Sequence, residues 1–368
     1  MCEQDNIEKN AGRPDFSRRQ FLTRTGLTMT GLAAATLAAP AASHAGQAAA
    51  HGTAKEPMKI ILGSGQYRYE CVHDWLLKPD YLEWGDTQGI AEDSRGNIYI
   101  SHTVGGGSVS QDAIVVFDKA GKFLTSFGSR FAGGGHGLEL RKEANQEFLY
   151  HCDTAHRMFV KTTLTGEVIW EKGTPQEPGV YKEGVNFVPT NIAFSPNGDF
   201  YVADGYGSSY IHQYDIRGNW IRTFAGPGTD PGKCRTPHGL WVDTRLKDPL
   251  LAVADRSNNR IQYFTLDGKH VSFVSEGMRQ PCHFKMRGDE LLVPDLNSVV
   301  TILDKDNKVA VQLGDGADVP DLRGHKRSEF KPGKFIHPHD AIFLHNGDIV
   351  VAEWVPNGRV TLLRKLKV

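Results

Sequence analysis

Six segments of the chain repeat one pattern, and this repetition constrains the fold more than any other feature. Each segment has a short apolar strand, a turn rich in Gly, Asn or Asp, and a second apolar strand that ends in a polar residue. The copies occupy residues 89–102, 137–153, 191–204, 239–255, 283–295 and 340–353. Five copies continue into a third and a fourth strand, so that one unit covers about 50 residues. Four short strands per unit with period-2 patterning predict an all-β fold, a six-bladed β-propeller, with an open solenoid as the alternative.

The last copy is incomplete, and its missing strand is expected from the other end of the chain. The sixth copy stops after its third strand, within residues 358–368, which would leave an unpaired sheet edge of the kind that native sheets avoid. The segment Tyr67–Trp75 has the composition of a strand and lies before the first copy. We therefore expect this N-terminal strand to complete the last blade as its outermost strand. It would close the ring into a single domain over residues 58–368.

Residues 1–45 have the features of a twin-arginine signal peptide. Ser17-Arg18-Arg19-Gln20-Phe21-Leu22 matches the export motif and precedes an uncharged, mildly apolar stretch over residues 25–42. Ser43-His44-Ala45 then offers small residues at the positions that a signal peptidase recognises, which favours cleavage over a membrane anchor. Residues 46–57 have the composition of a flexible linker. The sequence predicts export of the folded protein by the twin-arginine translocase and a periplasmic or secreted mature protein without a membrane partner.

Charge and cysteine content narrow the function further. With 42 Lys and Arg against 43 Asp and Glu the net charge is -1, so a nucleic-acid-binding protein steered by phosphate attraction is not expected. The cysteines that follow residue 45 form neither a CxxC pair nor a zinc knuckle. Proteins exported by the twin-arginine route fold in the reducing cytoplasm, so this fold does not need disulfide bonds.

The residue just before each copied segment begins the innermost strand and is expected to line one mouth of the central channel. These positions hold Gln88, His136, Thr190, His238, Cys282 and His339. The three histidines fall on alternate blades, where three imidazoles can meet at one metal ion and leave a fourth position open, as in catalytic zinc sites. A favoured Pro-His-Gly turn is the alternative explanation for this pattern.

The motifs around these histidines resemble those of NHL-type six-bladed propellers and, among them, the peptidyl-α-hydroxyglycine α-amidating lyases. The resemblance runs from about Trp84 to the C-terminus and is most specific in Gly135-His136-Gly137-Leu138, Asp204-Gly205-Tyr206, Pro237-His238-Gly239-Leu240, Ala254-Asp255-Arg256 and Pro338-His339-Asp340. It implies that His136, His238 and His339 bind a catalytic Zn²⁺ or another divalent transition metal. It also implies a structural Ca²⁺ held by Asp340 and the carbonyl groups of Ile90 and Leu138, which are oxygen ligands that suit calcium. Tyr206 is then the catalytic tyrosine and Arg256 one of two active-site arginines.

The sequence departs from the family pattern at the second of these arginines. Thr103 stands there, directly after His102, and Gly207 stands where the lyases have a disulfide cysteine beside the tyrosine. His102 is expected to hydrogen-bond a substrate. His337, two residues before His339, should point to the same side of an extended strand, where it is a candidate fourth ligand, supporting group or proton donor. A scaffold that keeps the metal ligands and changes this arginine is expected to keep the type of chemistry and to change the substrate.

These features predict an exported metal-dependent enzyme that acts on a small molecule in the axial mouth of the propeller. A lyase that splits a carbinolamide-type C–N bond is the leading hypothesis. A metal-dependent ester or lactone hydrolase is the second, because activation of water by a metal needs the same parts. A non-catalytic NHL binding module is the third, since a fold does not determine a function.

Overall fold

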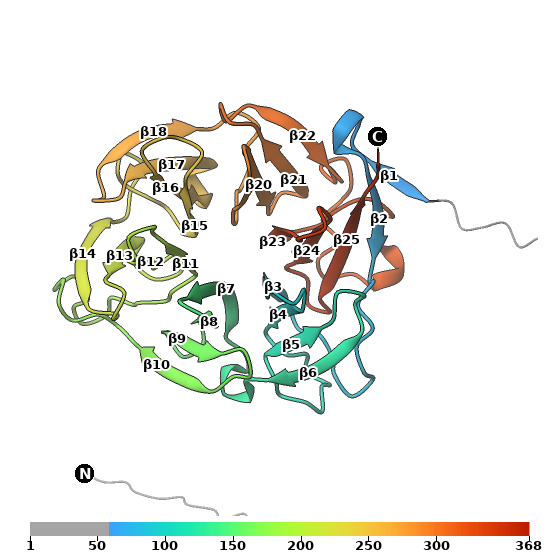
Figure 1. Ribbon diagram of the computed structural model, residues 1–368, viewed down its shortest axis with the longest axis horizontal. Coiled ribbons are helices and arrows are strands. Elements are labelled where there is room, and N and C mark those ends of the chain that lie inside the picture. The colour runs from blue at the N-terminus through green and yellow to red at the C-terminus, as the bar shows by residue number, and fades with distance from the viewer. Residues whose placement is uncertain (1–58, 368) are drawn as a thin grey trace, which may run out of the picture. The chain divides into compact units, whose positions relative to one another are not determined.

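The computed structural model describes residues 59–367 and arranges them as six β-sheets around a central axis (Figure 1). Five sheets have four strands and one has five. The all-β, six-bladed propeller that the repeats predict is thereby confirmed. Among the described residues no helix has the length and apolar character needed to cross a membrane. The predicted signal peptide over 1–45 and the linker over 46–57 lie outside the described residues.

Each of the first five blades is a four-stranded antiparallel sheet whose first strand lies at the axis, and four short 3₁₀ helices lie between strands. Blade 1 contains β3 (Thr87–Glu92), β4 (Ile98–His102), β5 (Ile114–Phe117) and β6 (Phe123–Phe127). Blade 2 contains β7 (Gly135–Glu143), β8 (Gln146–Asp153), β9 (Met158–Thr163) and β10 (Val168–Lys172). Blade 3 contains β11 (Asn191–Phe194), β12 (Phe200–Ala203), β13 (Tyr210–Tyr214) and β14 (Trp220–Ala225). Blade 4 contains β15 (Pro237–Asp243), β16 (Leu250–Asp255), β17 (Arg260–Thr265) and β18 (His270–Val274). Blade 5 contains β19 (Lys285–Arg287), β20 (Glu290–Asp295), β21 (Val299–Leu303) and β22 (Val309–Leu313). The 3₁₀ helices are η1 (Gly65–Tyr67), η2 (Ser129–Phe131), η3 (Arg256–Asn258) and η4 (Arg327–Glu329).

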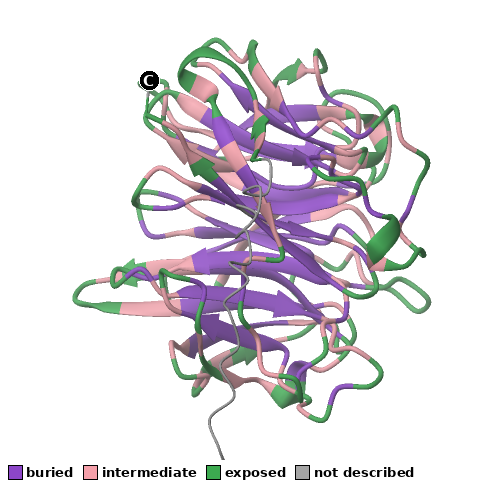
Figure 2. Cartoon of the chain, turned by 90° about the vertical axis from the view of Figure 1, so that its right-hand side faces the viewer, coloured by how far each residue is buried: buried purple, intermediate pink, exposed green. Residues whose placement is uncertain are grey.

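The core lies between neighbouring blades. Buried residues run along the strands, whereas exposed residues gather at the turns and the outer edges (Figure 2). Between blades 2 and 3, the ring of Phe200 packs against those of Tyr150 and Phe159 with centroid distances of 6.0 and 6.2 Å. Large rings of this kind contribute most to the burial of apolar surface. Because one blade cannot cover both of its faces alone, each blade depends on its two neighbours.

The turn between the first two strands follows from its Asp, Gly and Asn residues. In blade 1, the carboxylate of Asp93 accepts hydrogen bonds from the N–H groups of Arg95 and Asn97 at 2.9 and 2.8 Å. Gly96 has a φ of 83°, in the left-handed region that favours glycine. Gly198, at the same place in the third copy, has a φ of 102°. In blades 1 and 3 these turn residues therefore set the hairpin at the far end of the innermost strand.

Strands from the two ends of the chain pair in blade 6. This blade contains β23 (Pro338–Phe343), β24 (Ile349–Glu353) and β25 (Arg359–Lys365), and β2 (Tyr69–His73) pairs antiparallel with β25. The N-terminal segment thus lies where the sequence predicts it, but it is not the outermost strand. β1 (Ile60–Leu62) pairs with the outer side of β2 and gives this blade a fifth strand. The repeats do not reveal β1, because no other blade has an equivalent strand.

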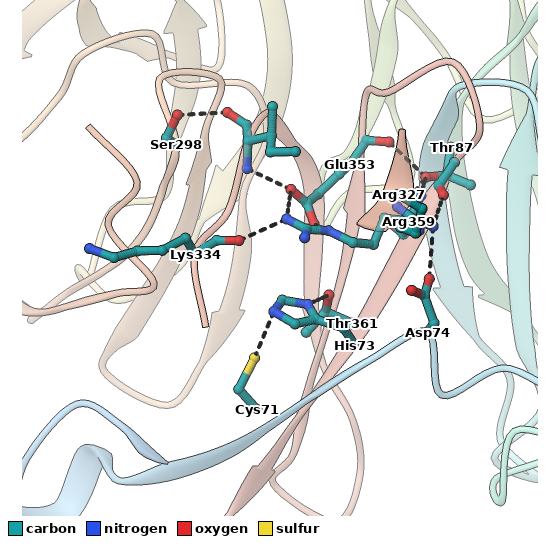
Figure 3. A network of polar contacts seen from close by, with 12 residues as sticks. Cys71, His73, Asp74, Thr87, Ser298, Arg327, Lys334, Glu353, Arg359 and Thr361 are labelled. Carbon is teal, nitrogen blue, oxygen red and sulfur yellow. Dashed lines mark hydrogen bonds and ion pairs between the residues drawn. The ribbon is translucent and has the colours of Figure 1, made fainter. Parts of the chain in front are cut away.

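A buried ion pair ties this last blade to the segments beside it (Figure 3). Arg359 is 1% exposed, and its Nη2 lies 2.7 Å from Oε1 of Glu353 and 2.8 Å from the carbonyl oxygen of Lys334. The backbone carbonyl of Glu353 accepts the hydroxyl proton of Thr87 at 2.8 Å. Since Lys334 precedes blade 6 and Thr87 begins blade 1, the ion pair couples three segments of the chain where the ring closes.

Deletion of residues 58–80 is expected to destabilise the whole ring rather than to fray one edge. The deletion removes β1 and β2, exposes the edge of β25 and opens the core cluster that contains Tyr69. We expect a single calorimetric transition at a lower Tm and faster hydrogen exchange in all six blades. A chain that begins at residue 58 is the matched control, because it keeps both strands. Faster exchange confined to blade 6 would contradict the expectation.

Candidate metal centre

A bulge near the start of the innermost strand turns each axial histidine toward the channel. In β7, β15 and β23 the register with the second strand shifts where His136, His238 and His339 lie. β3 has the same shift but carries Gln88 at the axial position. A bulge inserts an extra residue and re-aims its side chain, so the histidines leave the regular alternation of the sheet.

The three histidines meet on the axis. Their ring centroids are 4.7 to 4.9 Å apart, and their ring planes cross at 68° to 88°. One ligand nitrogen from each ring lies within 4.8 Å of the other two, and no side chain of the three is more than 3% exposed. The structure therefore brings together the three residues that the repeat spacing singles out.

Each imidazole is oriented by a carbonyl group of the next blade. The Nδ1-to-oxygen distances are 2.8 Å for His136 to Thr190, 2.9 Å for His238 to Cys282 and 2.9 Å for His339 to Gln88. A carbonyl oxygen can only accept, so Nδ1 carries the proton and Nε2 keeps its lone pair. The three Nε2 lone pairs are thus available to one ligand on the axis.

Burial keeps the three imidazoles neutral. It lowers the pKa of His136 to about 3 and holds the pKa values of His238 and His339 well below their ordinary value. Nε2 of His339 is buried and has no hydrogen-bond partner. Three neutral nitrogen ligands, one of them orphaned, fit a divalent transition metal, which needs deprotonated imidazole nitrogens.

The glycine that follows two of these histidines is needed because the backbone of the next blade comes close. A Cβ on Gly137 would lie 2.3 Å from the carbonyl oxygen of Thr190, and a Cβ on Gly239 would lie 2.3 Å from that of Cys282. These carbonyl groups are the ones that accept the imidazole protons. The His-Gly pair therefore allows the close approach of blades that orients the imidazole.

Gly239→Ala is expected to lower the free energy of unfolding by about 1–3 kcal/mol, because the added methyl group cannot fit against the backbone of Cys282. The added methyl group should also push away the Cys282 carbonyl group that orients His238, and metal binding by His238 should weaken as a result. Denaturant unfolding and metal titration measure the two effects. Gly173→Ala is the matched control, since nothing lies within 4 Å of a Cβ at that position. Equal destabilisation by the two substitutions would show that close approach is not the reason for the glycine.

Tyr206 lies beside the triad with its hydroxyl oxygen 2.9 Å from Nε2 of His238 and 3.3 Å from Nε2 of His136. Its residue surface is 42% exposed, so the side chain reaches from the buried triad to solvent. Burial raises the pKa of Tyr206, although Arg256 opposes this effect. Without a metal the phenol therefore keeps its proton and donates it to an imidazole nitrogen.

The turn that carries Tyr206 explains why no cysteine stands beside it. The carboxylate of Asp204 accepts hydrogen bonds from the N–H groups of Val188 and Ser208, each at 2.7 Å. A Cβ on Gly207 would lie 2.0 Å from Oδ1 of Asp204, so this position has room only for glycine. Within residues 59–367 the four cysteines are free and buried.

Arg256 contacts the tyrosine from the start of η3. Its Nη1 lies 3.3 Å from the hydroxyl oxygen of Tyr206 and 3.9 Å from Sγ of Cys282. Burial raises the pKa of the Cys282 thiol to about 11, so this sulfur is a neutral neighbour rather than a thiolate ligand. A permanent positive charge beside Tyr206 can orient an anionic or carbonyl group of a substrate.

His102 is held by the loops of blade 1, and its expected contact with a substrate stays a prediction. Its Nδ1 accepts hydrogen bonds from the N–H groups of Gly85 and Val104, both at 3.2 Å, and its Nε2 donates to the carbonyl oxygen of Asp112 at 3.0 Å. The side chain is fully buried. Both ring nitrogens are therefore occupied by hydrogen bonds to the loops of blade 1.

Thr103 holds the same loop and supplies no charge. Its hydroxyl oxygen accepts the N–H proton of Asp86 at 2.9 Å. The carboxylate of Asp86 accepts a hydrogen bond from Arg323 at 2.8 Å, and this guanidinium stacks on the ring of Trp354. A guanidinium group therefore reaches this loop from the segment that precedes blade 6, a contact that the repeats do not indicate.

His337 does not join the triad. Its Nδ1 lies 2.7 Å from the carbonyl oxygen of Leu296, and its Nε2 lies 3.1 Å from a carboxylate oxygen of Asp321. Both nitrogens face acceptors of the protein, so His337 is not a fourth ligand. It lines a cleft of about 350 Å³ between blade 5 and the segment before blade 6. A supporting role for His337 stays a prediction.

The residues expected to hold calcium do not fit that ion. Oδ2 of Asp340 accepts the N–H proton of Ile90 at 2.7 Å, and Oδ1 pairs with Nδ1 of His283. Ile90 and Leu138 are expected to contribute backbone carbonyl groups, and their side chains pack in the cores between blades. The imidazole of His283 therefore lies against Asp340, where the resemblance implies a calcium ion.

The sequence contained a signal for this unexpected partner of Asp340. The residues one position past the axial ring are Gly89, Gly137, Asn191, Gly239, His283 and Asp340. Three glycines leave room on the axis, and His283 and Asp340 are the two ionisable members of this second ring. Comparison of the copies at this position, and not only at the axial one, predicts their contact.

The chain is similar to amidating monooxygenases, amidating lyases and an NHL repeat protein, although no family model matches it. It is 29% identical over 248 residues to peptidyl-glycine alpha-amidating monooxygenase of Mus musculus, over 58% of this chain and 24% of the relative. It is 28% identical over 322 residues to peptidyl-alpha-hydroxyglycine alpha-amidating lyase 1 of Drosophila melanogaster, and the match covers 75% of this chain and 56% of the relative. It is 27% identical over 239 residues to NHL repeat-containing protein 3 of Homo sapiens, and the match covers 61% of this chain and 65% of the relative. The chain spans less than two thirds of the length of these relatives.

Solved structures support the fold. A streptogramin B lyase has a TM-score of 0.55 and 14% identity over 80% of this chain and 98% of its own. Virginiamycin B lyase from Staphylococcus aureus with quinupristin has a TM-score of 0.53 and 13% identity, and the match covers 81% of this chain and 100% of the lyase. At these identities the likeness shows the propeller fold alone. Taken with the sequence relatives, the chain is a six-bladed propeller whose homologues are amidating lyases and NHL repeat proteins.

Proposed function

We propose that this protein is a metal-dependent lyase that cleaves a carbinolamide-type C–N bond in a small molecule at the axial mouth. The observation that carries the proposal is the convergence of three imidazole Nε2 atoms beside the Tyr206 hydroxyl. The amidating lyases among the relatives suggest the class of reaction. Zn²⁺ is the proposed ion, because three neutral imidazoles with one position left for a substrate are the ligand set of catalytic zinc.

The chain's own residues supply the proton transfer. A divalent cation held by His136, His238 and His339 would supply Lewis acidity toward a substrate oxygen. Tyr206 lies beside two of these rings, where its hydroxyl can pass a proton to the amide nitrogen and take the proton of the carbinol hydroxyl. The electrons of that O–H bond form the carbonyl group as the C–N bond breaks. The products are an aldehyde and an amide, and Tyr206 regains its proton.

Two further residues bear on the substrate. Arg256 would orient an anionic or carbonyl group, since its guanidinium contacts the hydroxyl of Tyr206. Thr103 lacks the charge and the fork of the arginine that the resemblance implies at its position. We therefore expect peptidyl-α-hydroxyglycine itself to be a poor substrate.

A metal-dependent ester or lactone hydrolase is the second candidate. Thr103 favours it, because Thr103 carries no charge and the nearby guanidinium of Arg323 is already paired with Asp86, which suits an uncharged substrate. The same cation and Arg256 would then act on an ester carbonyl group. The two candidates differ in their products, so one assay separates them.

The assay compares chelator-stripped protein with protein restored by one equivalent of Zn²⁺. The substrates are N-acyl carbinolamides, with and without a carboxylate, and a set of simple esters and lactones. Zinc-dependent release of an aldehyde and an amide supports the lyase, and zinc-dependent release of an acid and an alcohol supports the hydrolase. Turnover that is equal in stripped and restored protein contradicts both. Binding of zinc without turnover of any substrate favours the NHL binding module.

We also propose that the protein is exported through the twin-arginine pathway, on the strength of the motif at Arg18 and Arg19. N-terminal sequencing of protein from cell fractions should find a mature chain that begins near Gly46 outside the cytoplasm. Replacement of both arginines by lysine should leave the unprocessed chain inside. Processing that is unchanged by this replacement would contradict the proposed route.

A further inference from the structure

A cluster of four buried charged side chains lies on the axis, one layer past the metal triad. We call Glu139, His283, Lys285 and Asp340 the axial charge cluster. Nε2 of His283 lies 2.7 Å from Oε1 of Glu139, while its Nδ1 pairs with Oδ1 of Asp340. Nζ of Lys285 pairs with Oε2 of Glu139. The side chains of Glu139, His283 and Asp340 are 3 to 5% exposed, and that of Lys285 is 15% exposed.

The strands explain how the cluster assembles. Residues i and i+2 of a strand point to the same side, which places Lys285 beyond His283 and Glu139 beyond Gly137 along the axis. Gly137 leaves the space that a side chain from blade 2 would fill. A cavity of about 10 Å³ remains between the triad and this layer, enough for about one water molecule.

The contacts require His283 to be protonated. The shortest contact of each ring nitrogen is with a carboxylate oxygen, which accepts hydrogen bonds and cannot donate them. Nε2 also lies 3.0 Å from Nδ2 of Asn191, but its contact with Oε1 of Glu139 is shorter, at 2.7 Å, so each ring nitrogen carries a proton. Burial raises the pKa of Glu139, but Lys285 and His283 together lower it. The cluster therefore holds two positive and two negative charges.

We propose that His283, supported by Lys285, takes the place of a divalent cation on the propeller axis, and that loss of its ring would turn Glu139 and Asp340 into a calcium site. The His283 ring already joins Asp340 on blade 6 to Glu139 on blade 2, which is the link that an axial cation would make. Calcium would also need six to eight oxygen ligands, where the cavity has room for about one water molecule. The inference is independent of the proposed function, because it concerns neither the triad metal nor turnover.

The test is the thermal stability of His283→Asn with calcium and with EGTA. Asparagine is chosen because Asn191 stands at the equivalent position of blade 3. The wild-type Tm should be the same in calcium and in EGTA. The variant in EGTA should melt roughly 5–10 °C lower, since two buried carboxylates lose their cation. Millimolar calcium should restore part of that loss, and magnesium should restore less.

His151→Asn is the matched control. His151 is 3% exposed, its Nε2 lies 2.7 Å from the hydroxyl oxygen of Thr162, and its pKa is lowered by burial alone. Its replacement should lower the Tm without a response to calcium. A calcium response of His283→Asn no larger than that of the control would overturn the proposal.

The wild-type protein supplies a second, independent measurement. After dialysis from calcium-containing buffer, elemental analysis should find no calcium in stoichiometric amount. One bound equivalent of calcium, or a wild-type Tm that falls in EGTA, would overturn the proposal. Elemental analysis and the wild-type Tm in EGTA test the proposal even if His283→Asn does not fold. Neither measurement depends on zinc or on activity.

Discussion

Tyr206→Phe is expected to lower kcat by roughly 10²–10⁴-fold, the usual contribution of a positioned proton donor or acceptor. The substitution removes the oxygen that lies 2.9 Å from Nε2 of His238 and 3.3 Å from the guanidinium of Arg256. It leaves the ring and its packing in place. Metal content and Tm should therefore stay near wild type, and steady-state kinetics on whichever substrate the product assay identifies should show the loss in kcat.

Tyr210→Phe is the control for this experiment. Tyr210 lies on β13, and its ring packs against Tyr181 rather than against the triad. Its replacement should leave kcat within a few-fold of wild type. If Tyr206→Phe keeps the wild-type rate, the phenol has no part in proton transfer, and water activated at the metal becomes the better explanation of turnover.

Substitution of any one triad histidine by alanine should release the metal and abolish turnover. His136, His238 and His339 each offer one ring nitrogen to a metal ion. Loss of a group that merely orients a ligand typically weakens metal binding by about 10–100-fold, so loss of a ligand itself should exceed that effect. Elemental analysis and competition with a chromophoric chelator measure the change. The ring should stay folded, because each substitution removes one side chain from the axis and leaves the blade interfaces intact.

His337→Ala is the matched control for the triad. His337 lies two residues before His339, but both of its ring nitrogens face acceptors of the protein. Its replacement should leave one equivalent of metal bound. If the triad variants and His337→Ala lose metal to the same extent, or if none of them loses it, the ion is held elsewhere.

The sequence was sufficient to predict the ring and the axial histidines, because both depend on local features that recur. Period-2 patterning repeats in every blade, and a glycine of positive φ recurs in the first turn of blades 1, 3, 5 and 6. The copy number sets the number of blades. The histidines sit at one fixed position of that repeat. Their approach therefore follows from the symmetry of the ring rather than from any particular contact.

The contacts of several site residues could not be predicted, because they join segments that are distant in the sequence. Asp340 pairs with His283, which lies 57 residues away on another blade, in the place where the resemblance implies calcium. His102 is engaged by Gly85 and Asp112, which belong to loops without a repeat pattern. β1 has no counterpart in the other blades, so the repeat could not predict it.

Anomalous diffraction tests the metal centre most directly. Crystals of the protein purified without added chelator and supplied with zinc are measured on both sides of the zinc absorption edge. We predict one anomalous difference peak on the propeller axis, within bonding distance of Nε2 of His136, His238 and His339, at about 2.0–2.1 Å. The absence of a peak there, or a peak bound by other side chains, would contradict a metal centre built from these three histidines.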